Sequence, residues 1–174
     1  MSPASSDAIV RVIERSVDGL GLDWTRSSAH TVTVTLPGAR KLTTACALEV
    51  GRHTVNVRAF VARRPEENHE AVHRWLLERN LRLALVGFAL DRHGDIHLCG
   101  RIPVAVVTPD LVDELLGIIA ETADSSFNTI LELGFASSIR REWQWRLDRG
   151  ESTANLAAFD HLRPPEAPPT SSES

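Results

Sequence analysis

The chain has 174 residues, of which 43% are hydrophobic and 24% charged, as is ordinary for a globular protein large enough to bury a core. Its net charge of −4 at pH 7 supplies no strong positive field to attract nucleic acid or an anionic membrane. No run of about 18 apolar residues predicts a membrane span, and the N-terminus lacks the pattern of a secretory signal. The two cysteines, Cys46 and Cys99, lie outside any C-x-x-C motif, so we expect free thiols in a cytoplasmic protein.

The first part of the sequence predicts one amphipathic helix followed by three strands. Good N-cap residues lead into apolar residues at helical spacing, and two glycines end this helix. Strict alternation of threonine with valine and leucine predicts the first strand, and a glycine between the next two predicts a hairpin. The helix covers about 6–18, and the strands cover 31–36, 42–50 and 53–62.

The second part predicts a helix, two strands and a long helical segment. A proline followed by two acidic residues suits the start of the middle helix, because acidic groups interact favourably with its dipole. A His-Gly pair predicts a hairpin turn between the two strands. A Thr-Pro pair begins the final helical segment, which should bend near Gly134. The helix covers 66–82, the strands 83–90 and 95–104, and the last segment starts at 108–110.

These elements indicate an α+β fold of order α-βββ-α-ββ-α(α). Because the strands come in hairpins, the sheet of about five strands should be mainly antiparallel, with helices flanking it. We expect a single domain over 1–162. The Pro- and Ser-rich segment 163–174 has no apolar periodicity, and we expect it to be a disordered tail.

The segment HEAVH at 69–73 has the H-E-x-x-H pattern of a zinc-hydrolase helix. In that chemistry His69 and His73 would bind zinc from one helix face, and Glu70 would act as general base on the zinc-bound water. A catalytic zinc needs a third protein ligand, however, and the residues that follow supply no motif containing one. A zinc-dependent hydrolase is therefore the alternative hypothesis, and we expect surface histidines with no metal and no other cofactor.

The segment DRHGDIH at 91–97 places two aspartates and two histidines at a period of two residues. On one continuous strand these groups would line one face and resemble a ligand set. The turn at Gly94 instead separates them onto two antiparallel strands, which predicts a polar hairpin tip with Arg92 paired to Asp95.

The segment 140–149 combines four arginines with Trp143 and Trp145, which could stack on nucleic acid. The two tryptophans are two positions apart and so face nearly opposite ways on a helix, while Glu142 and Asp148 dilute the positive charge. A nucleic-acid-associated regulator is therefore only a third hypothesis. One of the tryptophans is expected to enter the core or a subunit interface.

Three segments in order resemble the YbjN-domain family, and its actinobacterial branch in particular: TVTVTLPG, RRPEENHEAVHRWLLERNLRL and DSSFNTILELGFASSIRREWQWR. The resemblance covers about 22–162. It implies a fold similar to that of type III secretion chaperones, which are small α+β units, usually dimeric, that bind extended segments of client proteins. The family is described as bacterial sensory-transduction regulators, and it brings no catalytic motif to any position of this chain.

We therefore expect a non-enzymatic cytoplasmic protein-binding module, homodimeric, with a chaperone-like or regulatory role. Its partners would be a second copy of the chain and a client or regulatory protein, and neither nucleic acid nor a membrane. Binding would use apolar surface or strand addition at a sheet edge. The candidate interface residues are Phe127, Phe135, Trp143 and Trp145.

Overall fold

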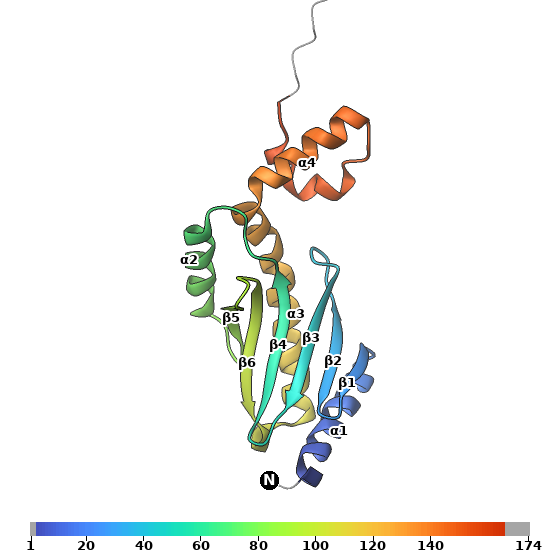
Figure 1. The fold of residues 1–174 in the computed structure, drawn as a ribbon. Coiled ribbons are helices and arrows are strands. Elements are labelled where there is room, and N and C mark those ends of the chain that lie inside the picture. The colour runs from blue at the N-terminus through green and yellow to red at the C-terminus, as the bar shows by residue number, and fades with distance from the viewer. Residues whose placement is uncertain (1–2, 166–174) are drawn as a thin grey trace, which may run out of the picture.

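The computed structural model describes residues 3–165 and consists of one sheet with helices packed against it (Figure 1). In this part of the chain six strands form an antiparallel sheet of order β1-β2-β3-β4-β6-β5. The predicted α+β class, the antiparallel sheet and the order of the predicted elements are confirmed. Residues 166–174 of the expected tail lie outside the described residues.

Each helix and strand has the following bounds. The strands are β1 (Asp23–Ser28), β2 (Thr31–Pro37), β3 (Thr43–Val50), β4 (Thr54–Ala62), β5 (Gly87–Leu90) and β6 (Ile96–Pro103). The α-helices are α1 (Pro3–Gly19), α2 (His69–Asn80), α3 (Pro109–Gly134) and α4 (Ala136–Arg149). Two 3-10 helices are η1 (Val104–Val106) and η2 (Ala154–Leu162).

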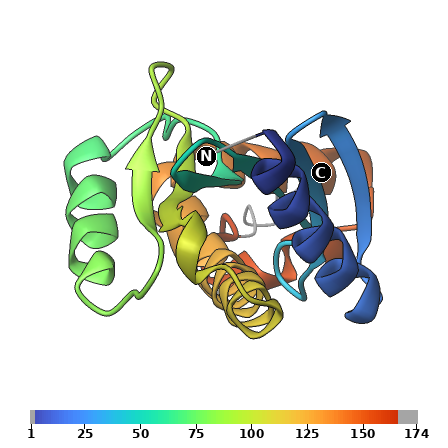
Figure 2. The same ribbon diagram turned by 90° about the horizontal axis from the view of Figure 1, so that it is seen from below.

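The helices pack on one face of the sheet and leave its other face open (Figures 1 and 2). Along β2, Val32, Val34 and Leu36 are buried while the threonines between them are half-buried or exposed, because successive strand residues point to opposite faces. The same alternation continues through β3 and β4. The buried face forms one core with the apolar stripes of α1 and α3, and each large side chain buried there contributes about 1.5–3 kcal/mol.

Strand β1 was not predicted from the sequence. Its residues, DWTRSS, show no apolar alternation, and only Trp24 is half-buried. Trp24 donates its Nε1–H to Asp18 at 2.7 Å, at the end of α1. The strand exists because its backbone pairs with β2 at the edge of the sheet, and a pairing partner leaves no periodic signal in the strand's own sequence.

The middle helix begins at His69, three residues later than the prediction of 66–82. The backbone N–H groups of Glu66 and Glu67 donate instead to the carbonyl of Gly134, where α3 ends. The carboxylate of Glu67 accepts hydrogen bonds from the backbone N–H of Ser137 at 2.6 Å and from its hydroxyl at 2.8 Å, in the first turn of α4. The carboxylates of Glu66 and Glu67 therefore accept hydrogen bonds at the N-terminus of α4 rather than at that of α2.

Strand β5 is also shorter than the predicted 83–90. The segment between α2 and β5 turns, with Leu85 at a positive φ of 65°. Asn80 at the end of α2 accepts a hydrogen bond from the Phe88 N–H at 2.7 Å and donates one to its carbonyl at 3.2 Å. The side chain of Asn80 thus pairs with both the N–H and the carbonyl of Phe88 on the outer edge of the sheet.

The predicted bend near Gly134 is confirmed, since α3 ends there and α4 begins at Ala136. A Cβ atom at Gly134 would lie 2.8 Å from the Cβ of Pro65, so a larger residue would force the two segments apart. Beyond the bend, α4 and η2 form a second apolar cluster of Ile139, Trp143, Leu156 and Phe159, which we call the C-terminal lobe. No helix among residues 3–165 combines the length and apolar character needed to cross a bilayer.

Asp124 of α3 fixes the turn between β2 and β3. Its Oδ1 accepts the backbone N–H groups of Arg40 at 2.6 Å and Lys41 at 2.9 Å. Partial burial raises the pKa of this carboxyl, but the hydrogen bonds from Lys41, Arg40 and Ala39 outweigh it and hold the pKa below its usual range.

We predict that Asp124→Ala lowers the free energy of unfolding by about 1–2 kcal/mol at pH 7, because two backbone donors lose a charged acceptor. A carboxyl with a depressed pKa stabilises the fold above its unfolded-state value, about 3.9, and loses that contribution as the pH falls further. Urea unfolding at pH 7 and pH 3 should therefore show a smaller difference from wild type at pH 3. Asp113→Ala, at an exposed position of α3, is the control; an equal difference at both pH values would contradict the assignment.

Candidate functional site

The HEAVH segment forms the first residues of α2 without assembling a metal site. The rings of His69 and His73 stack with centroids 6.3 Å apart and planes 21° from parallel. Glu70 faces solvent, 3.4 Å from Arg74 on the next turn. Among the described residues no three His, Cys, Asp or Glu side chains group closely enough to hold a metal ion. The zinc-hydrolase hypothesis therefore lacks the third ligand that its chemistry requires.

We predict that zinc does not raise the melting temperature of the protein and that a preparation made without a histidine tag contains no stoichiometric zinc. The reason is that two histidines alone hold zinc weakly. Differential scanning fluorimetry and elemental analysis provide the measurement, with His69→Ala as the control. One zinc per chain that is lost in His69→Ala would restore the hydrolase hypothesis.

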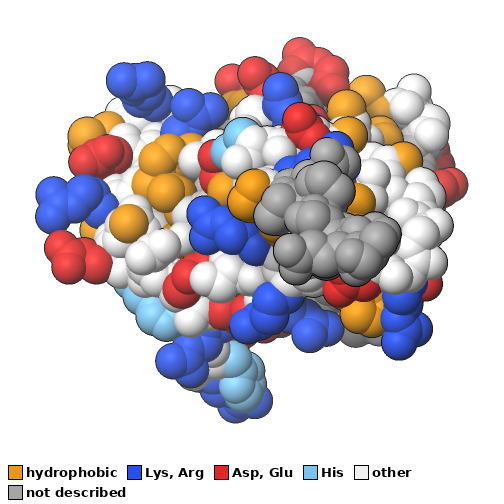
Figure 3. Space-filling view, turned by 90° about the horizontal axis from the view of Figure 1, so that it is seen from above, with side chains coloured by type: hydrophobic (Ala, Val, Ile, Leu, Met, Phe, Trp, Pro, Cys, Tyr) orange, Lys and Arg blue, Asp and Glu red, His pale blue; other side chains and the backbone are white. Residues whose placement is uncertain are grey.

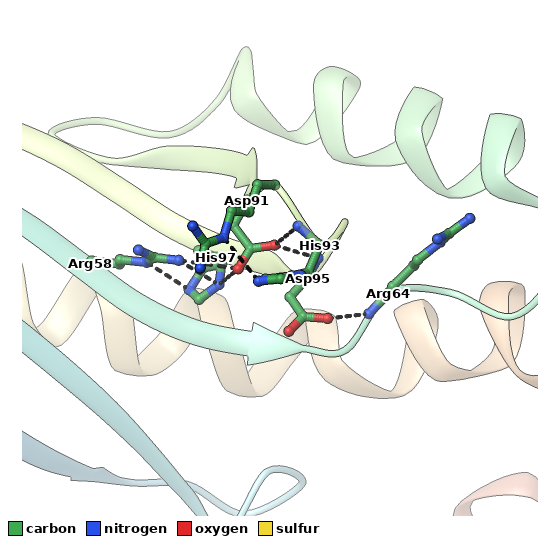
Figure 4. Close-up of polar contacts among 7 residues, drawn as sticks. Arg58, Arg64, Asp91, His93, Asp95 and His97 are labelled. Carbon is green, nitrogen blue, oxygen red and sulfur yellow. Dashed lines mark hydrogen bonds and ion pairs between the residues drawn. The ribbon is translucent and has the colours of Figure 1, made fainter.

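The polar residues of 91–97 form a hydrogen-bonded cluster at the end of the β5–β6 hairpin (Figure 4). Asp91 Oδ1 accepts the backbone N–H groups of His93 at 2.8 Å and Asp95 at 3.0 Å, which closes the turn. Asp95 accepts the backbone N–H of Arg64 at 2.8 Å. The predicted pair between Arg92 and Asp95 is not formed, because Asp95 is turned towards the end of β4 and Arg92 contacts His93.

His97 anchors Arg58 on the open face of the sheet (Figure 4). The Arg58 Nε–H donates to His97 Nδ1 at 3.3 Å, and Arg58 Nη2 lies 3.3 Å from Asp91 Oδ2. His97 Nε2 lies 3.4 Å from the same Asp91 oxygen and 3.2 Å from Arg58 Nη2, so its role as donor or acceptor depends on the ring tautomer. His97 is only 8% exposed, and its ring meets the Phe60 ring edge-on at 5.5 Å.

Charge and burial keep this histidine neutral at pH 7. Burial and the positive charge of Arg58 lower the pKa of His97 below its usual value, and Asp91 only partly offsets them. For Asp91, burial raises the pKa, but hydrogen bonds from the N–H groups of His93 and Asp95 bring it below its usual range. The cluster thus holds an ionised carboxylate, a neutral imidazole and a guanidinium in fixed relative positions.

Next to this cluster, the open face carries a shallow hollow of about 610 Å³. Arg58 lies opposite Cys99 across the β4–β6 pair, and Asn56 lies opposite Arg101. Its lining includes the small side chains of Ala47 and Cys99 and the polar side chains of Thr31, Glu49, Asn56, Arg58 and Arg101.

A second exposed feature lies on the outer side of α2. Leu77 is 67% exposed, and Leu81, just after the helix ends, is 87% exposed. Together with Glu70, Arg74 and Glu78 they occupy one stripe at helical spacing, opposite the buried Val72 and Leu76. These two leucines face water on the same helix face, so the stripe is a candidate contact surface.

The structure separates the four predicted interface residues. Phe135 and Trp143 lie together in the C-terminal lobe, where Trp143 is 3% exposed and donates its Nε1–H to the Phe159 carbonyl at 3.3 Å. Phe127 is half-buried on α3, with the Lys41 ammonium 5.8 Å from its ring centroid. Trp145 is 42% exposed and stacks with the Arg149 guanidinium at 4.7 Å. Only Trp145 therefore presents much of its side chain for a contact.

The arginines of α4 are largely engaged within the chain. Arg146 pairs with Glu142 at 2.6 Å and with Glu151 at 4.0 Å, and Arg141 lies 3.7 Å from Glu66. Basic and acidic side chains are interspersed on this end of the molecule (Figure 3). No observation here favours the nucleic-acid hypothesis, which needs an unpaired basic surface.

Solved structures share this fold. The structure of the ExsC–ExsE complex matches with a TM-score of 0.52 and 16% identity, covering 72% of this chain and 95% of that one. The ExoU–SpcU complex of the Pseudomonas aeruginosa type III secretion system matches with a TM-score of 0.52 and 20% identity, covering 69% and 98%. The HopA1–SchA chaperone–effector complex matches with a TM-score of 0.52 and 12% identity, covering 71% and 95%. The protein has the α+β fold of type III secretion chaperones.

Sequence relatives identify the family. Residues 10–132 match the family model YbjN, described as "Putative bacterial sensory transduction regulator". An uncharacterized protein of Mycobacterium tuberculosis is 48% identical over 166 residues, 92% of this chain and 91% of that protein. An uncharacterized protein of Mycobacterium leprae is 55% identical over 129 residues, 74% of this chain and 70% of that protein. The chain belongs to the YbjN family, as the three sequence segments predicted.

Proposed function

We propose that the protein is a non-enzymatic protein-binding module with a chaperone-like role, and that it acts in the cytoplasm. The observation that carries the proposal is the open face of the sheet, in a fold whose solved relatives are held in complexes with other proteins. An open sheet face exposes side chains at every second strand position and offers a broad surface for an extended segment. The free thiols of Cys46 and Cys99 agree with a reducing compartment.

The absence of catalysis is part of this proposal. The charged groups that meet on the sheet, Arg58, Asp91 and His97, bind one another and leave no base facing a nucleophile. The hollow beside them is shallow and open, whereas catalytic sites exclude water.

We further propose that the protein is a homodimer through the outer stripe of α2. An isologous contact uses the same patch on both copies, so the stripe must complement itself. In an antiparallel pairing of two α2 helices, Arg74 of one copy approaches Glu78 of the other, and Glu70 approaches Arg82. Leu77 would then lie near the centre of the contact and Leu81 towards each of its ends, so both exposed leucines would be covered.

We predict that Leu77→Glu with Leu81→Glu yields a monomer, because each copy would bring two charges into the contact in place of its apolar side chains. Light scattering after size-exclusion chromatography over a range of concentrations provides the measurement. Leu42→Glu is the matched control, since Leu42 is 78% exposed in the β2–β3 turn and away from α2. Arg74→Glu should weaken the dimer, and adding Glu78→Arg should restore it. A wild-type protein that is monomeric at every concentration would refute the dimer.

The protein-binding role is tested by affinity capture from the native host followed by reconstitution. We predict that a captured protein, once purified, forms a complex of defined mass with this chain. Ala47→Trp should abolish that complex, because a large side chain fills the hollow. Trp145→Ala should weaken it if the C-terminal lobe contributes, and Asp113→Ala is the control. Failure of every captured protein to reconstitute a complex would count against the proposal.

A further inference from the structure

We propose that the hollow on the open face binds a carboxylate side chain of an acidic, extended client segment, through Arg58 and Arg101. This inference rests on the protein-binding role proposed above and specifies the chemistry of the client. An interaction between two guanidinium groups and one carboxylate provides strong charge-assisted hydrogen bonds.

The sheet register brings the two arginines together. Arg58 on β4 faces Cys99, and Arg101 is two positions further along β6, opposite Asn56. The two arginines are therefore diagonal neighbours on one face, with Cβ atoms about 7 Å apart, within reach of one carboxylate placed between their side chains. The small side chains of Ala47 and Cys99 leave room for the incoming group.

Arg58 is held in position before any partner arrives. Its Nε donates to the neutral His97 and its Nη2 to Asp91, which fixes the plane of the guanidinium. Across residues 3–165 neither Nη1 of Arg58 nor the guanidinium of Arg101 has a hydrogen-bond or ion-pair partner. Donors that are pre-oriented and unpaired lose little conformational entropy on binding an anion.

The balance of charge in the hollow favours an anion. Its lining contains Arg58 and Arg101 against one carboxylate, Glu49, which accepts a hydrogen bond from Asn56 at 3.5 Å. His97 adds no charge at neutral pH because burial lowers its pKa, and burial raises the pKa of the Cys99 thiol, so no thiolate competes. Asp91 pairs with Nη2 of Arg58 at 3.3 Å and leaves Nη1 without a partner in the described part of the chain.

The shape of the surface favours a protein segment over a small molecule. The hollow is shallow, and beside Ala47 the strand register places the small side chains of Thr33 and Ala45 on the same face, so a chain could lie across the strands. A free anion would keep much of its surface in water here, whereas small-molecule sites bury most of their ligand.

Fluorescence anisotropy with two labelled decapeptides tests the inference. One alternates Glu with Thr, and the other replaces every Glu with Gln. We expect binding of the Glu peptide to full-length protein, binding at least about tenfold weaker for the Gln peptide, and a further loss at high salt. Arg101→Gln and Arg58→Gln should each weaken binding of the Glu peptide about tenfold. Arg11→Gln, an exposed site on α1 with the same loss of charge, should not.

The outcomes separate this inference from the proposed function. Since the Arg101 guanidinium makes no hydrogen bond or ion pair within residues 3–165, Arg101→Gln separates loss of binding from loss of folding, and unfolding curves verify this. Equal binding of both peptides, or no effect of Arg101→Gln, would overturn the carboxylate site and leave the protein-binding role intact. Binding of neither peptide would overturn the inference as well, while the reconstitution experiment decides the wider role. Competition by inorganic phosphate or free glutamate at the peptide's own concentration would show a small-anion site instead.

Discussion

The one-sided covering of the sheet is the constraint on which the rest of the structure depends. All the helices that contact the strands do so from one side, so every second strand residue joins the core and the others remain at the surface. On β2 the other positions carry threonines, whereas Phe60 of β4 is a large apolar side chain on the open face, 37% exposed. Any charged group placed on that face is presented in a fixed register set by the strand pairing.

The Arg58–His97–Asp91 cluster shows how this register creates chemistry. Arg58 lies on β4, His97 on β6 and Asp91 at the end of the β5–β6 hairpin. They meet because β6 pairs with β4 as well as with β5, its neighbour in sequence. A neutral, nearly buried histidine supports an exposed arginine, so the positive charge is oriented without being cancelled by the imidazole. Burying polar groups is costly unless they are hydrogen-bonded, and here His97, Asp91 and the Nε and Nη2 groups of Arg58 each have a partner.

A second junction joins the sheet to the C-terminal lobe. Gly134 lies against Pro65, and Glu67 accepts hydrogen bonds from Ser137 at the start of α4, so the segment before α2 sets the direction of the lobe. Hydrogen bonding by Ser137 lowers the pKa of Glu67, in keeping with a carboxylate at the positive end of a helix. The match to the family model ends at residue 132, next to this junction, so the lobe lies outside the matched segment.

Sequence patterns predicted the elements that carry their own periodicity and missed those that depend on a partner. The alternation of residues predicted strand β2, and the capping residue Thr108 predicted the start of α3. The Thr108 hydroxyl accepts the Leu111 N–H at 3.2 Å, as expected of an N-cap. Strand β1 has no alternation and required knowledge of its pairing with β2. Arg58 and Arg101 become neighbours only through the β4–β6 register, so no local motif could identify the hollow. The HEAVH segment shows the opposite case. Its local pattern matched the zinc-hydrolase motif completely, but the described structure around it supplies no third ligand.

The most direct test of the one-sided sheet is the reactivity of the two cysteines. Cys46 is 0% exposed on the covered face, and burial raises its pKa to about 12. Cys99 lines the hollow on the open face and is only partly buried. Titration of the native protein with a thiol reagent, followed by peptide mapping, should therefore modify Cys99 alone, with Cys46 reacting only after unfolding. Equal reactivity of both thiols, or protection of both in the native protein, would contradict a sheet covered on one face.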